Sequence, residues 1–464
     1  MGEYTLRHLV LSCAVAAVAG ILAMPSALAD YTWEYSEKGR CTFGADVRLR
    51  LTHFDRNVIS PVWGNFGESG PALEYLRVRE RIWGNFEFNE NLCLNVRLVN
   101  RWHDFSSNIG DPNDRDAGTW QFPDEVVVDR FNLRISQFMD TDWTLTLGRQ
   151  DFILGNGMVV LEGTPYDQGR TIYLDGITAA CVKERDTVKL FGFYNDYLDK
   201  TVFINDRNRT LRRGDTWLGG VNWIHTFTPK VNTDLYYLFC EVDDDSENNA
   251  VRNHAADQNA QFSVFGGRVF GDLHEQVDYS GELAFQNGDL GDGTDMTGMM
   301  ADLRLNLRSA PETAMSPEVQ LQITHFSGDD DESADEFEGW HPVYAEYPIW
   351  REELLPILFN GNWTNLTQYR TALKLNLYDS ERVGVRCSGA WALLIADEGG
   401  TPMNNPPQGG AGDNIGHLLS AFIDVALKDL NTSISLQAST FDPGDYWQEG
   451  RGAEWLRMQM VYTF

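Results

Sequence analysis

Cysteine, basic residues and long apolar runs are all scarce in this sequence of 464 residues. Its 6 cysteines are widely scattered, and none has the C-x-x-C spacing of a metal or redox site. We therefore expect no disulfide framework, no metal site and no cofactor. The predicted places of Cys41, Cys93, Cys181, Cys240 and Cys387 are positions within strands. Lys and Arg number 37 against 68 Asp and Glu, and the net charge of −31 argues against nucleic acid as a partner.

The most apolar stretch lies at the N-terminus. Arg7 and His8 precede an apolar run over 9–24, and Ala27-Leu28-Ala29 has the small-x-small pattern of a signal-peptidase site. The run is shorter than the roughly 20 residues that cross a bilayer as a helix. We therefore predict a signal peptide over residues 1–29 and an exported chain over residues 30–464.

Glycine and aromatic residues are plentiful instead. The counts of 42 Gly, 14 Trp, 17 Tyr and 25 Phe suit many strands and tight turns better than a helical protein. The mean hydropathy of −0.35 is typical of a soluble chain. A membrane barrel gives the same value, because only every second residue of its strands faces lipid.

The stretch 454–464 shows this alternation most clearly. Leu456, Met458, Met460, Tyr462 and Phe464 are apolar or aromatic, and the residues between them are largely polar. A final strand with an aromatic terminus resembles the assembly signal of bacterial outer-membrane barrels, in which the last strand closes the sheet against the first. The sequence therefore predicts a barrel in the outer membrane, with membrane lipid and the outer-membrane assembly machinery as partners.

Strand-like segments of about 9–15 residues recur along the chain, a length that suits tilted membrane strands. Short connections such as 89–91 and 140–142 alternate with long ones such as 328–363. We predict an all-β fold, a transmembrane antiparallel β-barrel of about 18 strands with short periplasmic turns and long extracellular loops. The predicted strands centre near 43–53, 75–88, 92–103, 126–137, 143–150, 170–183, 186–197, 215–227, 231–242, 259–271, 276–287, 296–308, 318–327, 364–378, 382–396, 416–428, 431–440 and 454–464.

Sequence parity indicates which side chains of these strands face the interior. A cation that faces lipid costs about 2–4 kcal/mol at the bilayer midplane, so the arginines should turn inward. Glu80 falls on the lipid side of its strand, which requires a bulge or a position near the headgroups. By parity the interior receives Arg48, Arg50, Arg77, Arg79, Arg81, Arg97, Arg101, Arg130, Arg134, Arg304, Arg308, Arg370, Lys374, Arg382, Arg386 and Arg457.

Acidic residues with inward parity are fewer, and they include Asp46, Asp302 and Asp424. Pairing with these acids explains individual arginines as structural residues, but it does not balance the whole excess. The surplus creates a positive potential that concentrates anions in a channel with low-dielectric walls. Guanidinium groups also bind carboxylates through two parallel hydrogen bonds. We therefore predict a solute that bears carboxylates.

One stretch resembles a known family. Leu147-Gly148-Arg149-Gln150-Asp151-Phe152, then Gly155 and Gly157, then Arg170-Thr171-Ile172 and Asp175-Gly176, is similar to the signature of alginate-export outer-membrane channels. The resemblance implies a monomeric barrel with an arginine-lined constriction that passes an anionic uronate polymer. It adds Arg149 and Arg170 to the candidate binding residues. Simple parity places Arg149 beside Leu145 and Leu147, so we expect it above the hydrocarbon or beyond a bulge.

Other functions stay open beside an anion-selective channel. A general porin for small solutes is one, and an adhesin that acts through the aromatic residues Trp340, Tyr344, Tyr347 and Trp350 is another. The histidines have no nucleophile motif such as G-x-S-x-G, so no enzyme is expected. The acidic runs 243–245 and 329–338 lack the EF-hand spacing, and we interpret them as solvated loops rather than calcium sites.

Overall fold

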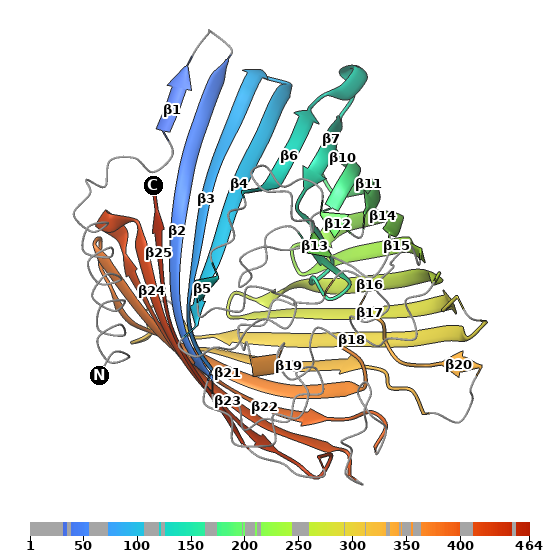
Figure 1. The fold of residues 1–464 in the computed structure, drawn as a ribbon, viewed down its shortest axis with the longest axis vertical. Helices are drawn as coiled ribbons and strands as arrows, with labels where there is room; N and C mark the ends of the chain where they lie inside the picture. Colours follow the sequence, from blue (N-terminus) through green and yellow to red (C-terminus); the bar gives the residue numbers. More distant parts are fainter. Residues whose placement is uncertain are drawn as a thin grey trace.

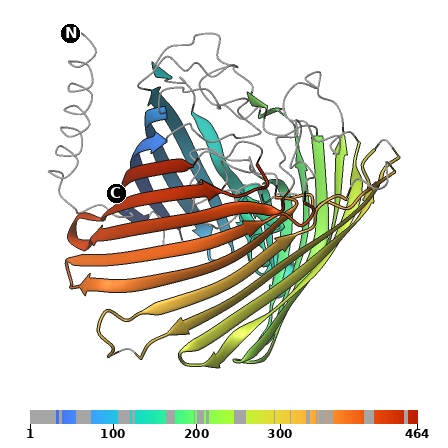
Figure 2. The same ribbon diagram turned by 90° about the horizontal axis from the view of Figure 1, so that it is seen from below.

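A computed structural model of the chain shows antiparallel strands joined side by side into one closed wall (Figures 1 and 2). Among the described residues, no helix is long and apolar enough to cross a membrane. The described residues are 31–34, 39–54, 73–105, 120–121, 126–162, 174–196, 198–199, 209–210, 215–243, 259–291, 293–310, 312–330, 335–342, 345, 354–355, 363–399, 412–447 and 452–464.

The wall is a closed barrel of 18 strands within this part of the chain. Each strand pairs antiparallel with the next around the barrel. In order they are β2 (Arg40–Phe54), β3 (Leu73–Asn89), β4 (Leu92–Phe105), β6 (Val127–Ile135), β7 (Trp143–Gln150), β10 (Leu174–Val182), β11 (Asp186–Asn195), β14 (Asp215–Thr228), β15 (Val231–Asp243), β16 (Gln261–His274), β17 (Val277–Asp289), β18 (Asp295–Arg308), β19 (Glu318–Phe326), β21 (Leu366–Asp379), β22 (Val383–Ile395), β23 (Asn414–Leu427), β24 (Thr432–Pro443) and β25 (Ala453–Thr463).

Shorter elements lie outside this order. They are the strands β1 (Tyr31–Glu34), β5 (Trp120–Gln121), β8 (Phe152–Leu154), β9 (Val160–Glu162), β12 (Leu198–Asp199), β13 (Arg209–Thr210) and β20 (Glu336–Phe337), and the 3₁₀ turns η1 (Phe138–Asp140) and η3 (Lys428–Leu430). β8 and β9 pair only with each other, as a hairpin.

The final strand closes the barrel, as its alternation predicts. β25 pairs with β2 from Trp455 opposite Phe54 to Thr463 opposite Asp46. The backbone N–H of Phe464 adds a further hydrogen bond to the Ala45 carbonyl at 2.8 Å. Closure removes the free sheet edges whose unpaired backbone groups hydrocarbon cannot solvate.

The predicted strands are confirmed with ends that shift by a few residues. The segment predicted over 143–150 has the same bounds as β7. The segment predicted over 170–183 begins outside the described residues and continues as β10. The connections alternate as expected, with short ones such as 183–185 at one end of the barrel and long ones at the other. All five cysteines beyond the predicted signal peptide lie in strands, which confirms their predicted places.

Burial follows the parity that the sequence indicates. In β2, Arg48 and Arg50 are buried, whereas Phe43 and Leu51 are exposed on the outer face. β25 repeats this pattern in its first half, where Arg457 is buried and Leu456 is exposed. In its second half Met460 and Tyr462, which have the parity of Leu456, are buried. Hydrocarbon outside explains why the arginines turn inward, since an arginine that faced it at the midplane would cost about 2–4 kcal/mol.

Glu80 is an exposed residue on the outer face of β3. The register of β3 against β2 runs without a shift from Leu73 to Glu87, so no bulge turns Glu80 inward. The register therefore removes the bulge from the two explanations that parity allows.

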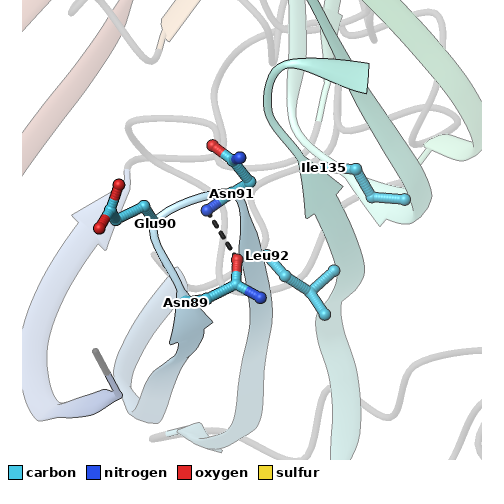
Figure 3. Close-up of a pocket in the computed structure, with 5 residues that line it drawn as sticks. All are labelled: Asn89, Glu90, Asn91, Leu92 and Ile135. Atoms are coloured by element: carbon cyan, nitrogen blue, oxygen red, sulfur yellow. Dashed lines mark hydrogen bonds between the residues drawn. The ribbon is translucent and has the colours of Figure 1, made fainter. Parts of the chain in front are cut away.

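A shallow pocket lies at the turn between β3 and β4 (Figure 3). There the backbone N–H of Asn91 donates to the Asn89 side-chain oxygen at 2.8 Å, which closes the turn. Asn89, Glu90, Asn91, Leu92 and Ile135 line the pocket. None of these residues carries a positive charge, so the pocket is not a candidate site for an anion.

Candidate functional site

Arginines from neighbouring strands meet on one side of the barrel interior. They lie opposite one another in register: Arg48 of β2 faces Arg79 of β3, which in turn faces Arg101 of β4. Arg50 faces Arg77 in the adjacent row. We call the whole set the arginine ladder, and it comprises Arg48, Arg50, Arg77, Arg79, Arg81, Arg97, Arg101, Arg130 and Arg457.

Like charges directly opposite one another destabilise a sheet, so the arginine ladder needs compensation. Asp46 supplies part of it, because its carboxylate lies 3.1 Å from Arg79 Nη2 and 2.6 Å from Arg81 Nη2. Neutral groups supply more. Arg50 donates to the side-chain oxygen of Gln459 at 2.6 Å, and Arg77 donates to His103 Nε2 at 2.8 Å.

The cations still outnumber the carboxylates on these strands. Among the described side chains of β2, β3, β4, β6 and β25, the inward carboxylates are Asp46, Glu87 and Asp129. Glu87 lies near the end of β3, where it pairs with Arg40. On these strands the described arginines therefore outnumber the described inward carboxylates, at a place where Arg50 is 0% exposed. Charges act on one another more strongly in such low-dielectric surroundings.

The hairpin formed by β8 and β9 folds into the barrel and covers the wall opposite the arginine ladder. Phe152 packs against Phe191 and Phe193, with ring centroids 4.7 and 5.2 Å apart. Leu154 and Val160 are buried in the same apolar cluster, together with inward side chains of β14 and β15. Burying these groups stabilises the inward position of the hairpin at about 25 cal/mol per Å² of apolar surface.

Two glycines shape the tip of this hairpin. Gly155 and Gly157 both have positive φ angles, of 57° and 75°, which residues with a Cβ rarely adopt. A Cβ at Gly155 would stand 2.1 Å from the nearest carboxylate oxygen of Glu282. Glycine thus allows the backbone to approach the wall closely and presents Asn156 to it.

Asn156 enters a buried row of charged side chains on the wall. The charged row consists of Asp234 (β15), Arg268 (β16), Glu282 (β17) and Asp302 (β18), which are consecutive partners across the sheet. Glu282 and Asp302 face each other, and both are 0% exposed. Two buried carboxylates side by side are costly unless donors satisfy them.

Asn156 supplies donors to both carboxylates. Its backbone N–H donates to Glu282 at 2.7 Å, and its side-chain amide donates to Asp302 at 3.1 Å. Its side-chain oxygen accepts from Arg268 Nη1 at 2.7 Å. An asparagine fits here because one side chain provides both a donor and an acceptor.

The wall itself supplies the remaining partners of the charged row. Tyr236 donates its hydroxyl to Glu282 at 2.7 Å. Gln322 and Thr324 each donate to Asp302 at 2.8 Å, and Arg304 Nε lies 2.7 Å from the same carboxylate. The tip of the hairpin is therefore held by several hydrogen bonds at once, which favours one fixed position.

The base of the hairpin contacts the arginine ladder. The Asp151 carboxylate lies 3.2 Å from Arg97 Nη2 and also pairs with Arg130. Arg97 pairs with Asp129 of β6 as well. In the strand order β4 and β6 lie on the far side of the wall from β17 and β18, so the hairpin crosses the interior between the arginine ladder and the charged row (Figure 1).

A second segment folds inward, in the loop that follows β19. Trp340 is buried, with its ring centroid 6.3 Å from that of Phe326. The backbone of His341 exchanges two hydrogen bonds with the Gln286 side chain of β17, at 2.7 and 2.9 Å. Trp340 is thus a packing residue of the interior. Tyr344, Tyr347 and Trp350 lie outside the described residues.

Acidic side chains gather in this same loop, outside the membrane-spanning strands. Asp330 raises the pKa of the Glu338 carboxyl most, and Glu336, Asp329 and Glu398 raise it further. Among the described residues, no cluster of acids and histidines has the arrangement of a metal site.

A fall in pH is therefore expected to stabilise the folded conformation of this loop. Because the pKa of Glu338 is raised in the folded protein, the folded state binds its proton more tightly, and the repulsion fades as pH falls through that pKa. The protection factors of the amides over 335–342, which compare each exchange rate with that of an unstructured peptide at the same pH, should rise as pH falls through the pKa of Glu338. Glu338→Gln should show the higher protection factors on both sides of that pKa. Protection factors that do not change with pH in the protein with Glu338 would contradict the prediction.

The other candidate arginines lie apart from the arginine ladder. Arg134 and Arg386 are exposed. Each of the remaining three has a neighbour: Arg304 pairs with Asp302, Arg370 donates to Gln320 at 2.7 Å, and Lys374 donates to Glu318 at 2.9 Å. Arg170 lies outside the described residues.

Arg149 lies on the outer side of β7. It faces Phe131 of β6 and Asp175 of β10 in register, and Phe131 is exposed to the outside. No register shift separates β7 from β10, so the bulge that could turn Arg149 inward is absent there. Asp175 neutralises Arg149 at 2.7 Å. Arg149 therefore does not join the arginine ladder.

The charged row and the tip of the hairpin escaped prediction from sequence. Asp151, Gly155 and Gly157 stand in the family-like stretch, but nothing in that stretch indicates that Asn156 meets Glu282. The inward parity of Asp302 was the only signal for the row. The partners of Asn156 are more than a hundred residues away in the chain, so only the folded barrel brings them together.

Comparisons with known proteins agree with this architecture. Residues 40–460 match the family model described as alginate export. The structure is similar to the outer membrane protein OprD of Pseudomonas aeruginosa, with a TM-score of 0.54 and 13% identity over 95% of this chain and 97% of that one. OccK5 (OpdH) of the same organism gives 0.56 and 11% over 93% and 99%. OccAB2 of Acinetobacter baumannii gives 0.56 and 11% over 91% and 98%.

No curated protein sequence matches the chain. The family model nonetheless covers nearly the whole barrel, from the first residue of β2 to within a few residues of the end of β25. The chain therefore belongs to the alginate export family and is a channel of the bacterial outer membrane, not an enzyme.

Proposed function

We propose that this channel is selective for anions and passes solutes that bear carboxylates, such as anionic saccharides and uronates, along the arginine ladder. The observation that carries the proposal is the excess of inward arginines over inward carboxylates on β2, β3, β4, β6 and β25. Bound anions would lower the repulsion between the facing arginines. The same field would draw anions toward this wall from either mouth.

The arrangement of the arginines also allows a bound carboxylate to leave. Rows of arginines follow one another along the strands at intervals of two residues, which is about 7 Å. A carboxylate can leave one row as it reaches the next, so no single site needs to bind it tightly. Conduction requires such weak and repeated binding.

The alternatives are less well supported. A general porin has no need of facing arginines, whose repulsion costs stability. An adhesin would present its aromatic residues outward, whereas Trp340 is buried against Phe326. Neither alternative requires a preference for anions, so the ion selectivity of the channel distinguishes both of them from the proposed function.

Neutralising two ladder arginines should reduce anion preference. In a planar bilayer with a potassium chloride gradient, the original channel should give a reversal potential that favours chloride. Arg48→Gln with Arg50→Gln should shift this potential toward zero, because two buried charges are lost from the interior.

The matched control is Arg382→Gln with Lys428→Gln, which removes two charges beside short turns, where Arg382 is 82% exposed and Lys428 is 43% exposed. This control should leave the reversal potential unchanged. A cation-selective original channel, or an equal shift in both double variants, would refute the proposed function.

A further inference from the structure

Asp151 occupies a place in the arginine ladder that a solute carboxylate would fit. Its two oxygens contact Arg97 and Arg130, the facing pair of β4 and β6. These are the contacts that a carboxylate makes with paired guanidinium groups. Asp151 does not belong to the wall, because it stands between β7 and the inward hairpin.

The two carboxylates that bind Arg97 differ in exposure. The Asp129 side chain is 6% exposed and belongs to β6, whereas the Asp151 side chain is 26% exposed. Arg130 is also partly open, at 33%. An arriving anion would therefore meet Asp151 and Arg130 first, while Asp129 continues to neutralise Arg97 from within the wall.

Exchange of Asp151 for a solute carboxylate would replace one set of charge-assisted hydrogen bonds with an equivalent set. The bonds to the guanidinium groups would balance, and the difference would be the release of the hairpin base. The tip would stay in place, because Asn156 is held by Glu282, Asp302 and Arg268. Phe152 would stay packed against Phe191 and Phe193, so the movement would be confined to Asp151 and the backbone next to it, at the base of the hairpin.

We infer that Asp151 is a built-in competitor for a carboxylate subsite formed by Arg97 and Arg130, and that an anionic solute displaces it and moves the base of the hairpin away from the arginine ladder. The inference rests on the proposed function and deepens it. It makes the inward hairpin a strap whose position depends on occupancy of the subsite.

Asp151→Asn removes the competing charge and keeps the shape of the side chain. With galacturonate added to the bilayer chamber, the concentration that half-blocks the chloride current should fall about tenfold, as expected for the loss of one competing interaction. Asp151→Glu retains the charge and should keep the original half-blocking concentration.

Glu318→Gln is the control for added positive potential, since Glu318 pairs with Lys374 and lies apart from both the hairpin and the arginine ladder. If it lowers the half-blocking concentration as much as Asp151→Asn does, general electrostatics explains the effect and the inference fails.

Movement of the hairpin gives a separate readout. Ile153 is 49% exposed, so a fluorinated isoleucine analogue placed there reports on the hairpin by ¹⁹F NMR. Galacturonate should shift this signal in the original protein, and neutral galactose should not. Asp151→Asn should show the shifted signal without any solute.

The outcomes separate the two proposals. A channel without anion preference refutes the proposed function. A channel that prefers anions, but whose ¹⁹F signal and half-blocking concentration ignore Asp151→Asn, refutes only the role of Asp151.

Discussion

Asn156→Asp should open the channel by releasing the tip of the inward hairpin from the wall. The change replaces the amide that donates to Asp302 with a carboxylate, and it leaves the size of the side chain unchanged. Three carboxylates would then meet where Glu282 and Asp302 are 0% exposed. An uncompensated buried charge costs about 3–5 kcal/mol, which is enough to expel the tip from the charged row.

Single-channel conductance is the measurement. We expect Asn156→Asp to raise the mean conductance and the current noise, because the strap loses its anchor on β17 and β18. Gly155→Ala should act in the same direction, since its Cβ would stand 2.1 Å from a Glu282 oxygen at a backbone angle that favours glycine. Asn91→Asp makes the same chemical change at an exposed turn and should leave conductance unaltered. Conductance equal to that of the original channel in both tip variants would show that the anchor does not restrict the current.

The contrast between wall and hairpin explains how far sequence reasoning reaches. Strands such as β2 and β25 were predictable because lipid and water impose a strict alternation on every residue. The inward orientation of Arg48, Arg97 and Arg457 follows from the same rule, since an arginine that faced lipid would cost about 2–4 kcal/mol.

The hairpin obeys no such rule, because it touches neither lipid nor its sequence neighbours. Its position depends on matching Asn156 to carboxylates from β17 and β18, and this matching depends on barrel size and strand register. Arg149 also shows that a sequence motif alone does not decide which face of the barrel a side chain takes. The family-like motif suggested a place in the interior, whereas register sets Arg149 beside Phe131 on the outside.

Loss of Asp46 should have the largest effect on stability. Its carboxylate is 3% exposed and pairs with both Arg79 and Arg81, so Asp46→Asn leaves two guanidinium groups facing an amide donor. Breaking a buried pair in this way costs about 3–5 kcal/mol. Glu318→Gln breaks the pair with Lys374, whose side chain is 52% exposed, and should cost only about 0–1 kcal/mol.

Urea unfolding of the refolded barrel in detergent gives both free energies, and equal values for the two variants would contradict the argument. Added galacturonate sharpens the test. If the arginine ladder binds carboxylates, galacturonate should restore part of the stability of Asp46→Asn, because a ligand that binds only the folded state stabilises it. Galactose lacks the charge and should restore none. Such a result would show that Arg79 and Arg81 need a carboxylate beside them for stability, and that a solute carboxylate can take the place of Asp46.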